Sequence, residues 1–304
     1  MTPLRPLRGI VPPLVTPLLG RDELDRAGLE RLVERVVTAG CSGVFVLGST
    51  GEAQALTYRL RLEMLRETAR LVNGRVPVLA GITDTAVGEQ VEFGKRAVEA
   101  GADALVTAQP YYFRLSQEDL LRHTEMLASE IDAPLFLYNM PGLTKLQYEP
   151  ETVARAAEMP GVIGFKDSSA DLIYFQRVMR LVRGREDFGV LIGPEELLGQ
   201  AVLMGAHGGI AGGSNLRPEL YVGLYRAAIE GRIADMQCLA RKVMEISESI
   251  YRVGDPATSY FRGLKCALGL EGICSELPAP PLAPLSEAER SRIREALSRN
   301  PPQP

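Results

Sequence analysis

The chain has 304 residues, of which 46% are hydrophobic and 24% are charged, and its formal net charge is −4. This length supports a sizeable core, and the even spread of charges, with no basic block or acidic tail, argues against nucleic acid as a partner. The first residues lack the long apolar run of a secretion signal and no stretch reaches membrane-spanning length, so we expect a cytoplasmic protein that does not bind a membrane.

Eight apolar runs are predicted to be strands. Each is continuously apolar rather than alternating, which is typical of parallel strands that are covered on both faces. In chain order the runs span residues 9–17, 43–48, 77–82, 102–108, 134–139, 162–167, 188–193 and 208–213.

Amphipathic helices are predicted between these strands. In the first of them, residues 25–40, Leu29, Leu32 and Val36 recur at helical spacing and Gly40 marks the end. The same pattern predicts helices over residues 57–72, 85–101, 116–131, 150–159, 171–183, 195–204 and 218–231.

This alternation predicts an α/β fold, a (β/α)8 TIM barrel over residues 1–231. A doubly wound open sheet is the alternative, but the stretch PLLGRDELD after the first strand lacks the glycine fingerprint that such a sheet uses to bind phosphate. After residue 231 only helical patterns follow, over 232–253, 256–268 and 286–298. We therefore expect residues 232–304 to form a C-terminal helical extension that packs on the barrel.

The stretch GVIGFKD, residues 161–167, ends an apolar strand on two charged residues. The active sites of such barrels lie at the C-terminal ends of the strands, so Lys166 is expected to face the site. A lysine at a strand end is more often structural when taken alone. In an apolar barrel interior, however, the neutral amine is favoured, and this form attacks a ketone to give a Schiff base.

The other strand ends offer hydroxyls and backbone amides. The GSTGE turn (48–52) can bind a carboxylate through exposed N–H groups and the hydroxyls of Ser49 and Thr50, and Tyr138 can pass protons. The four cysteines include no C-x-x-C pair and there are only two histidines, so we expect no metal site. Each motif alone could be an ordinary turn, but the set on consecutive barrel units favours Schiff-base chemistry.

The set of motifs resembles the dihydrodipicolinate synthase / N-acetylneuraminate lyase family of class I pyruvate-dependent aldolases. The matching pieces run in family order: GSTGE (48–52), PYY (110–112), YNMP (138–141), GFKD (164–167) and GGI (208–210). The resemblance covers roughly residues 8–270 and implies an enzyme that uses no metal or organic cofactor.

The resemblance also implies a role for individual residues. Lys166 would form the Schiff base with pyruvate or a pyruvate-derived substrate. Tyr138 would pass protons and position the substrate carboxylate. Ser49 and Thr50 would bind that carboxylate, and Thr50 would also take part in the proton relay.

Two further implications concern Ile210 and Tyr112. The backbone carbonyl of Ile210 would face the lysine. Tyr112 would enter the site of a neighbouring subunit, in a homotetramer built as a dimer of dimers.

Three positions bear on the substrate. True dihydrodipicolinate synthases carry an arginine five residues after the catalytic tyrosine, where this chain has Leu143, and an apolar side chain cannot form the two hydrogen bonds an arginine makes to a carboxylate. Glu195 and Glu196 stand where the lyase branch places acidic groups that hold sugar hydroxyls. A plain alternative is that these glutamates only favour the first turn of a helix.

We therefore expect a Schiff-base aldolase or lyase that joins pyruvate to an aldehyde, or cleaves a 2-oxo acid such as a 2-keto-3-deoxy sugar acid. One alternative is a diverged 4-hydroxy-tetrahydrodipicolinate synthase. Another, from a different class, is a barrel that binds a 2-oxo acid without turning it over.

Overall fold

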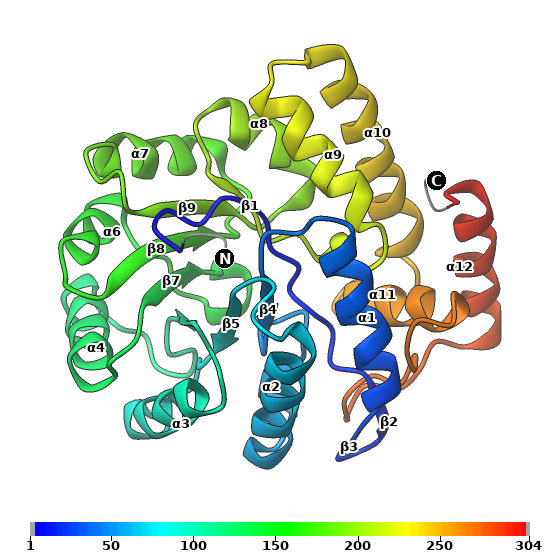
Figure 1. The fold of residues 1–304 in the computed structure, drawn as a ribbon, viewed down its shortest axis with the longest axis horizontal. Coiled ribbons are helices and arrows are strands. Elements are labelled where there is room, and N and C mark those ends of the chain that lie inside the picture. The colour runs from blue at the N-terminus through cyan, green and yellow to red at the C-terminus, as the bar shows by residue number, and fades with distance from the viewer. Residues whose placement is uncertain (1–3, 302–304) are drawn as a thin grey trace.

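Eight parallel strands form the central sheet of the computed structural model, which describes residues 4–301 (Figure 1). The order in the sheet is β1-β10-β9-β8-β7-β6-β5-β4. Its two end strands meet beside the bridge between Pro13 and Phe45, where the Leu14 N–H donates to the Phe45 carbonyl at 2.8 Å. The sheet therefore closes into the predicted barrel, from β1 (Gly9–Ile10), β4 (Val44–Val46), β5 (Val78–Gly81), β6 (Ala104–Ala108), β7 (Leu135–Asn139), β8 (Val162–Asp167), β9 (Gly189–Ile192) and β10 (Gly208–Gly209).

The apolar residues of the strands divide between two buried clusters, because successive side chains point to opposite faces of a strand. One cluster fills the barrel interior and includes Phe45, Val106, Phe136 and Leu191. The other lies between the strands and the surrounding helices. Gly164 makes room for the interior ring of Phe136, because a Cβ at this position would lie 2.1 Å from it.

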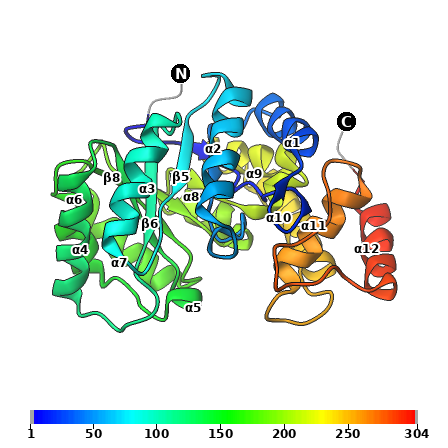
Figure 2. The ribbon, with the colours of Figure 1, turned by 90° about the horizontal axis from the view of Figure 1, so that it is seen from below.

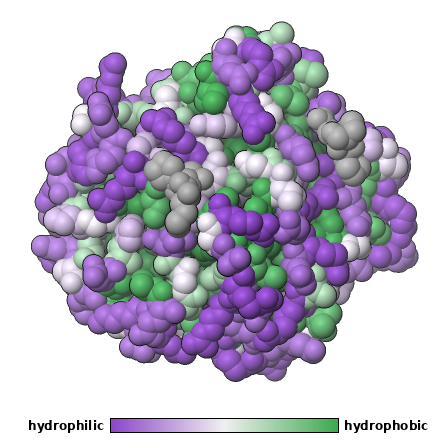
Figure 3. Space-filling view, in the orientation of Figure 1, coloured by the Kyte–Doolittle hydropathy of each residue, from purple (hydrophilic) through white to green (hydrophobic). Residues whose placement is uncertain are grey.

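Helices surround the strands as the sequence predicts, and most bounds agree within a few residues (Figure 1). The surface in this view is mostly polar, with small apolar patches (Figure 3). None of the described helices is long and apolar enough to span a bilayer. The helices around the barrel are α1 (Arg26–Thr38), α2 (Tyr58–Val72), α3 (Val87–Glu99), α4 (Gln117–Glu130), α5 (Pro141–Thr144), α6 (Pro150–Ala157), α7 (Leu172–Val182), α8 (Leu198–Leu203) and α9 (Pro218–Ile229).

The first and last predicted strands are much shorter than expected. Pro12 and Pro13 have no N–H to donate, so the ladder of residues 9–17 is regular only at β1. The residues after the predicted first strand form an antiparallel hairpin that was not predicted, made of β2 (Leu18–Gly20) and β3 (Glu23–Leu24). At the other end, β10 is followed by the 3-10 turn η3 (Gly212–Asn215).

Three further helices, α10 (Ile233–Ile250), α11 (Ser259–Leu270) and α12 (Glu287–Arg299), follow the barrel. Helix α10 packs on α8 and α9, and α11 and α12 lie beyond it on the same side of the barrel (Figure 2). This is the expected C-terminal appendix. The division of the chain into domains at residue 231 stays a prediction.

Candidate active site

Lys166 and Tyr138 lie side by side at the C-terminal ends of adjacent strands. The parallel register of β7 and β8 pairs Tyr138 with Lys166, and both side chains are buried. They line a cavity of about 320 Å³, which we call the lysine cavity. Its other lining residues come from the C-terminal ends of β4, β7, β8 and β9, the segment after β10, α5, the end of α10, and α11: they include Ser49, Thr50, Met140, Leu143, Ser168, Pro194, Glu195, Glu196, Ile210, Gly212, Tyr251, Tyr260 and Phe261.

The Lys166 amine is surrounded by aromatic rings rather than by acids. Its Nζ lies 3.9 Å from the ring centre of Tyr138 and 5.4 Å from that of Phe45. Within residues 4–301, Lys166 forms no ion pair. The faces of these rings therefore form the immediate surroundings of the Lys166 amine.

The neighbours of the Tyr138 hydroxyl lower its pKa. Burial alone would raise the pKa of Tyr138, but the Lys166 ammonium and hydrogen bonds with Ser49, Ser168 and Lys166 lower it below its ordinary value. The Ser49 hydroxyl lies 3.5 Å from the Tyr138 hydroxyl. A phenol with a lowered pKa gives up its proton more readily, as a general acid–base group requires.

The GSTGE turn is held in an unusual backbone conformation. Leu47 and Glu52, on either side of Ser49 and Thr50, have φ values of 62° and 54°, in the left-handed region that few non-glycine residues adopt. Such strain persists where surrounding contacts enforce it, often at functional sites. Here the Glu52 carboxylate accepts from the Ala279 N–H at 2.8 Å and forms a buried ion pair with Lys265.

Thr50 has a hydrogen-bond partner that the sequence did not suggest. Its hydroxyl lies 3.1 Å from the hydroxyl of Tyr260, which α11 brings to the cavity. Tyr251 and Phe261 line the same wall. These aromatic residues could not be predicted as part of the site, because they lie in the helical region beyond the barrel, where no strand end marks the site.

Glu195 and Glu196 line the lysine cavity, but their carboxylates already have partners. Glu195 accepts from the Tyr221 hydroxyl at 2.5 Å, the Tyr251 hydroxyl at 2.9 Å and the Gly213 N–H at 2.7 Å. Burial and the nearby Glu196 raise the pKa of Glu195 to about 7. Both glutamates start the 3-10 turn η2 (Glu195–Leu197), and the Ser247 hydroxyl donates to Glu196.

Ile210 and Leu143 also lie at the lysine cavity. Ile210 is buried after β10, and its N–H donates to the Ile192 carbonyl at 2.8 Å. Leu143 is half exposed on α5, a short helix that the sequence analysis did not predict. An adjoining cavity of about 290 Å³ shares Ser49, Tyr138 and Leu143 with the lysine cavity.

Tyr112 is the one candidate that the structure does not bring to the site. Its side chain is 79% exposed and packs edge-on against Phe113, with ring centres 5.1 Å apart. It lines neither cavity. The action of Tyr112 in a neighbouring subunit stays a prediction. In the part of the chain from residue 4 to 301, no group of three acidic, histidine or cysteine side chains is arranged to hold a metal ion.

Comparisons with known proteins point to one family. A sequence profile described as the dihydrodipicolinate synthetase family matches residues 6–300. The 4-hydroxy-tetrahydrodipicolinate synthase of Gluconacetobacter diazotrophicus is 34% identical over 96% of this chain and 96% of its own length. A probable 2-dehydro-3-deoxy-D-pentonate aldolase of Escherichia coli is 29% identical over 97% of this chain and 98% of its own.

Solved structures agree with this relationship. A dihydrodipicolinate synthase from Bacteroides thetaiotaomicron has a TM-score of 0.94 and 51% identity, and the match covers 97% of this chain and 99% of that one. A prophage protein of the dihydrodipicolinic acid synthase family from Escherichia coli, solved in complex with pyruvate, has a TM-score of 0.91 and 31% identity, with coverage of 97% and 98%. This chain therefore belongs to the dihydrodipicolinate synthetase family, whose members named here include synthases and an aldolase.

Proposed function

We propose that this chain is a class I aldolase or lyase that uses pyruvate and forms its Schiff base on Lys166. The observation that carries the proposal is the placement of a buried amine, without an acidic partner in residues 4–301, beside the hydroxyl of Tyr138 in the lysine cavity. A buried amine beside a proton-transfer group is what imine formation requires.

In the proposed reaction the neutral amine attacks the ketone carbon of pyruvate to give a carbinolamine. Its hydroxyl group takes up a proton and leaves as water, so that an iminium ion remains. The iminium nitrogen then draws the electron pair of a methyl C–H bond into a C=C bond, while the proton passes to the Tyr138 side. The resulting enamine carbon attacks the aldehyde carbon and forms a new carbon–carbon bond, while the C=O π bond breaks and the aldehyde oxygen takes up a proton. Hydrolysis of the iminium frees Lys166, and the reverse sequence cleaves a 2-oxo acid.

The pyruvate carboxylate would bind at the GSTGE turn. The N–H groups of Ser49 and Thr50 are not paired with another backbone group of residues 4–301, and both residues line the lysine cavity. Adjacent free N–H groups in such a turn attract an anion. Their hydroxyls add two further donors.

The charges around the site favour a neutral, hydroxylated aldehyde as the second substrate. Lys166 is the one cation among the described residues that line the two cavities, and Glu195 and Glu196 are acidic. Lys145 lines neither cavity, and its amine donates to the Gly142 carbonyl at 2.8 Å. A carboxylate on the aldehyde would therefore be buried near acids without a cation. This supports the cleavage or synthesis of a 2-keto-3-deoxy sugar acid.

A diverged 4-hydroxy-tetrahydrodipicolinate synthase is the second candidate, because relatives at 31–34% identity carry that name. The two candidates differ in the charge of the aldehyde. The test is a panel of aldehydes with pyruvate, in which kcat/KM is measured for neutral hydroxyaldehydes and for aspartate semialdehyde. Higher kcat/KM for the neutral members supports the aldolase; higher kcat/KM for aspartate semialdehyde supports the synthase. A protein that binds pyruvate but turns over neither is the non-catalytic barrel.

We also propose that the protein is cytoplasmic and assembles as a homotetramer in which Tyr112 reaches a neighbouring site. The exposed pair of Tyr112 and Phe113 supports a contact at this loop. Sedimentation of Tyr112→Phe, together with its activity, separates assembly from catalysis. An active monomer would contradict the proposal.

A further inference from the structure

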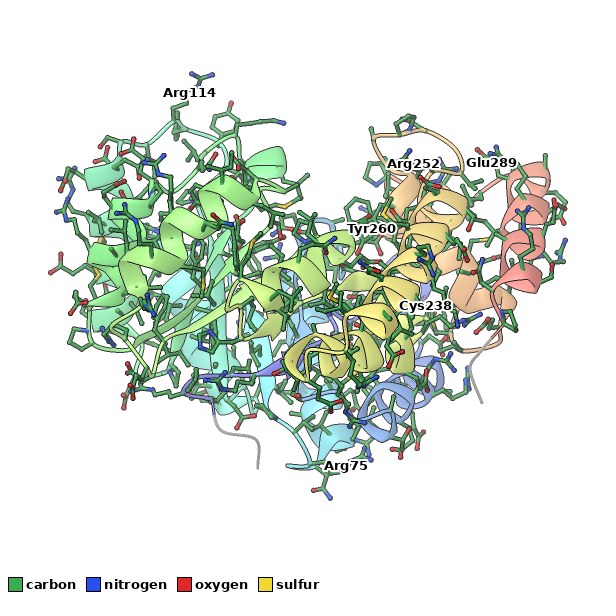
Figure 4. The ribbon with its side chains drawn as sticks, turned by 90° about the horizontal axis from the view of Figure 1, so that it is seen from above. Arg75, Arg114, Cys238, Arg252, Tyr260 and Glu289 are labelled. Atoms are coloured by element: carbon green, nitrogen blue, oxygen red, sulfur yellow. The ribbon has the colours of Figure 1, made fainter. Side chains whose placement is uncertain are left out.

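The GSTGE turn and helix α11 meet at two points. The Thr50 hydroxyl lies 3.1 Å from the Tyr260 hydroxyl, and Glu52 forms the buried ion pair with Lys265. Thr50 and Glu52 are two residues apart on the turn, and Tyr260 and Lys265 lie on the same helix. The ion pair thus fixes the distance and orientation between the turn and the phenol. Figure 4 places Tyr260 on the side of the C-terminal helices that faces the barrel.

Aromatic packing and two glycines determine where the Tyr260 hydroxyl lies. The ring of Tyr260 packs edge-on against Tyr251 at 5.0 Å and against Phe261 at 5.3 Å between ring centres. A Cβ on Gly212 would lie 1.7 Å from the Tyr260 hydroxyl, and one on Gly213 would lie 2.5 Å from the Tyr251 hydroxyl. The absence of side chains at both glycines therefore makes the space that the two phenols occupy.

Tyr251, which packs against Tyr260, is itself positioned by a hydrogen bond. Its hydroxyl donates to Glu195 at 2.9 Å, and Glu195 also accepts from Tyr221 and from the Gly213 N–H. Among the described residues, Thr50 is the one side chain that is hydrogen-bonded to the Tyr260 hydroxyl, and the ring of Tyr260 lines the lysine cavity. A partly exposed phenol that touches both a site hydroxyl and the cavity can exchange protons with water there.

We propose that Tyr260 is the positioning and proton-relay partner of Thr50, so that each subunit supplies this phenol from its own C-terminal helices. The inference rests on the proposed function, in which Thr50 takes part in proton transfer. A proton from water in the cavity moves to the Tyr260 oxygen, the Tyr260 proton moves to Thr50 Oγ1, and the Thr50 proton moves to the enamine carbon or aldehyde oxygen that gains it. The oxygens of Tyr260 and Thr50 each gain one proton and lose one, so Tyr260 remains neutral, and the hydroxide left from the water takes up the proton that Tyr138 received from the methyl group.

Burial strongly raises the pKa of Tyr260, which agrees with a phenol that stays neutral and passes protons in a concerted manner. The hydrogen bond with Thr50 acts against this rise but does not cancel it. Tyr138, with its lowered pKa, is the phenol better suited to hold a negative charge. The two tyrosines would thus have different tasks.

The test follows the exchange of the pyruvate methyl protons with D2O by NMR, because this exchange requires the imine and the proton transfer but no aldehyde. We expect Tyr260→Phe to slow the exchange about 10- to 100-fold, the range below that of a full general acid–base group. Borohydride should still trap the pyruvate adduct on Lys166 to the wild-type level. Tyr174→Phe is the matched control: it removes a buried phenol that bonds the Tyr148 carbonyl, outside both cavities, and should exchange at the wild-type rate.

A second variant disturbs the contact between Tyr260 and Thr50 without removing the phenol. Gly212→Ala keeps the phenol but displaces its hydroxyl, so its exchange should fall to the level of Tyr260→Phe. Because Tyr260 acts through Thr50, Thr50→Val combined with Tyr260→Phe should be no slower than Thr50→Val alone, a non-additivity that a structural role would not produce.

The outcomes separate this inference from the proposed function. Exchange at the wild-type rate in folded Tyr260→Phe or Gly212→Ala overturns the relay. Loss of the trapped adduct in Tyr260→Phe also overturns it, because the phenol would then act in substrate binding. If the wild-type protein itself traps no pyruvate on Lys166, the Schiff-base function fails instead.

Discussion

Glu52 and Lys265 form an ion pair that is almost completely buried, with side-chain exposures of 4% and 1%. One partner belongs to the turn after β4 and the other to α11, so the pair joins the active-site loop to the C-terminal helices. Burial lowers the pKa of Lys265, and the nearby Glu52 opposes this effect. We therefore expect the pair to affect both the stability of the protein and the position of the turn.

Removing one partner of this pair should be strongly destabilising. Lys265→Met leaves the Glu52 carboxylate without a counter-charge, and Glu52→Gln leaves the Lys265 ammonium in the same position. We expect each to lower the free energy of unfolding by about 3–5 kcal/mol, the range for one uncompensated buried charge. Urea denaturation measures this loss.

The double variant separates charge from packing. Glu52→Gln combined with Lys265→Met retains an acceptor for the Ala279 N–H and buries no charge. It should therefore be more stable than either single variant. As a control, Arg155→Ala breaks an exposed ion pair with Glu118 and should have a much smaller effect. Single variants as stable as the wild type would show that the pair is not a structural link.

Glu195 should make stability depend on pH. Its pKa is raised from 4.5 to about 7, so the folded protein holds the proton more tightly than the unfolded chain. Stability from this group is then fully present below about pH 4.5, falls as the pH rises towards 7, and levels off above. The loss over this window is about 3 kcal/mol, at 1.36 kcal/mol for each pKa unit.

The measurement compares wild type with Glu195→Gln by urea denaturation between about pH 4 and about pH 9. This range begins below the ordinary pKa of Glu195 and ends about two units above its raised pKa. Other groups titrate equally in both proteins, so the difference between their free energies of unfolding reports on Glu195. Wild type should lose stability relative to Glu195→Gln as the pH rises. A difference that stays constant with pH would mean that Glu195 is ionised throughout.

Leu143→Arg should change the choice of aldehyde. Leu143 is half exposed on α5 and borders both cavities, so an arginine could reach a carboxylate on the substrate without being buried. We expect the ratio of kcat/KM for aspartate semialdehyde to that for a neutral hydroxyaldehyde to rise about 10-fold, the effect of a charge-assisted contact of about 1.4 kcal/mol.

The control is Leu143→Met, which changes shape but not charge. Its ratio should remain within about twofold of the wild type, because such swaps alter packing only slightly. An unchanged ratio in Leu143→Arg would indicate that another part of the site selects the aldehyde.

The barrel could be predicted from the sequence because its strands are continuously apolar and regularly spaced, and β8 matches its predicted bounds of 162–167. The length of the first strand could not be predicted. Residues 9–17 are mostly apolar, but Pro12 and Pro13 interrupt the hydrogen-bonded ladder after β1. The hairpin of β2 and β3 lies outside the repeating strand–helix unit. Its residues carry no alternation long enough to mark it.

The candidate site follows the same division. Lys166, Tyr138 and the GSTGE turn could be found because the C-terminal ends of parallel strands meet at one edge. Tyr260 and Tyr251 could not, since they reach the cavity only through the packing of the C-terminal helices. The sequence also could not show that Gly212 and Gly213 leave room for those phenols. This follows only from the distances in the folded chain.

Borohydride reduction in the presence of pyruvate, followed by mass mapping of peptides, tests whether Lys166 forms a Schiff base with pyruvate. We predict one reduced pyruvate adduct, located on Lys166, and none in Lys166→Arg, which keeps a positive charge at the same strand end. An adduct on another lysine, such as Lys145 or Lys265, or no adduct at all in active protein, would show that Lys166 is not the Schiff-base lysine.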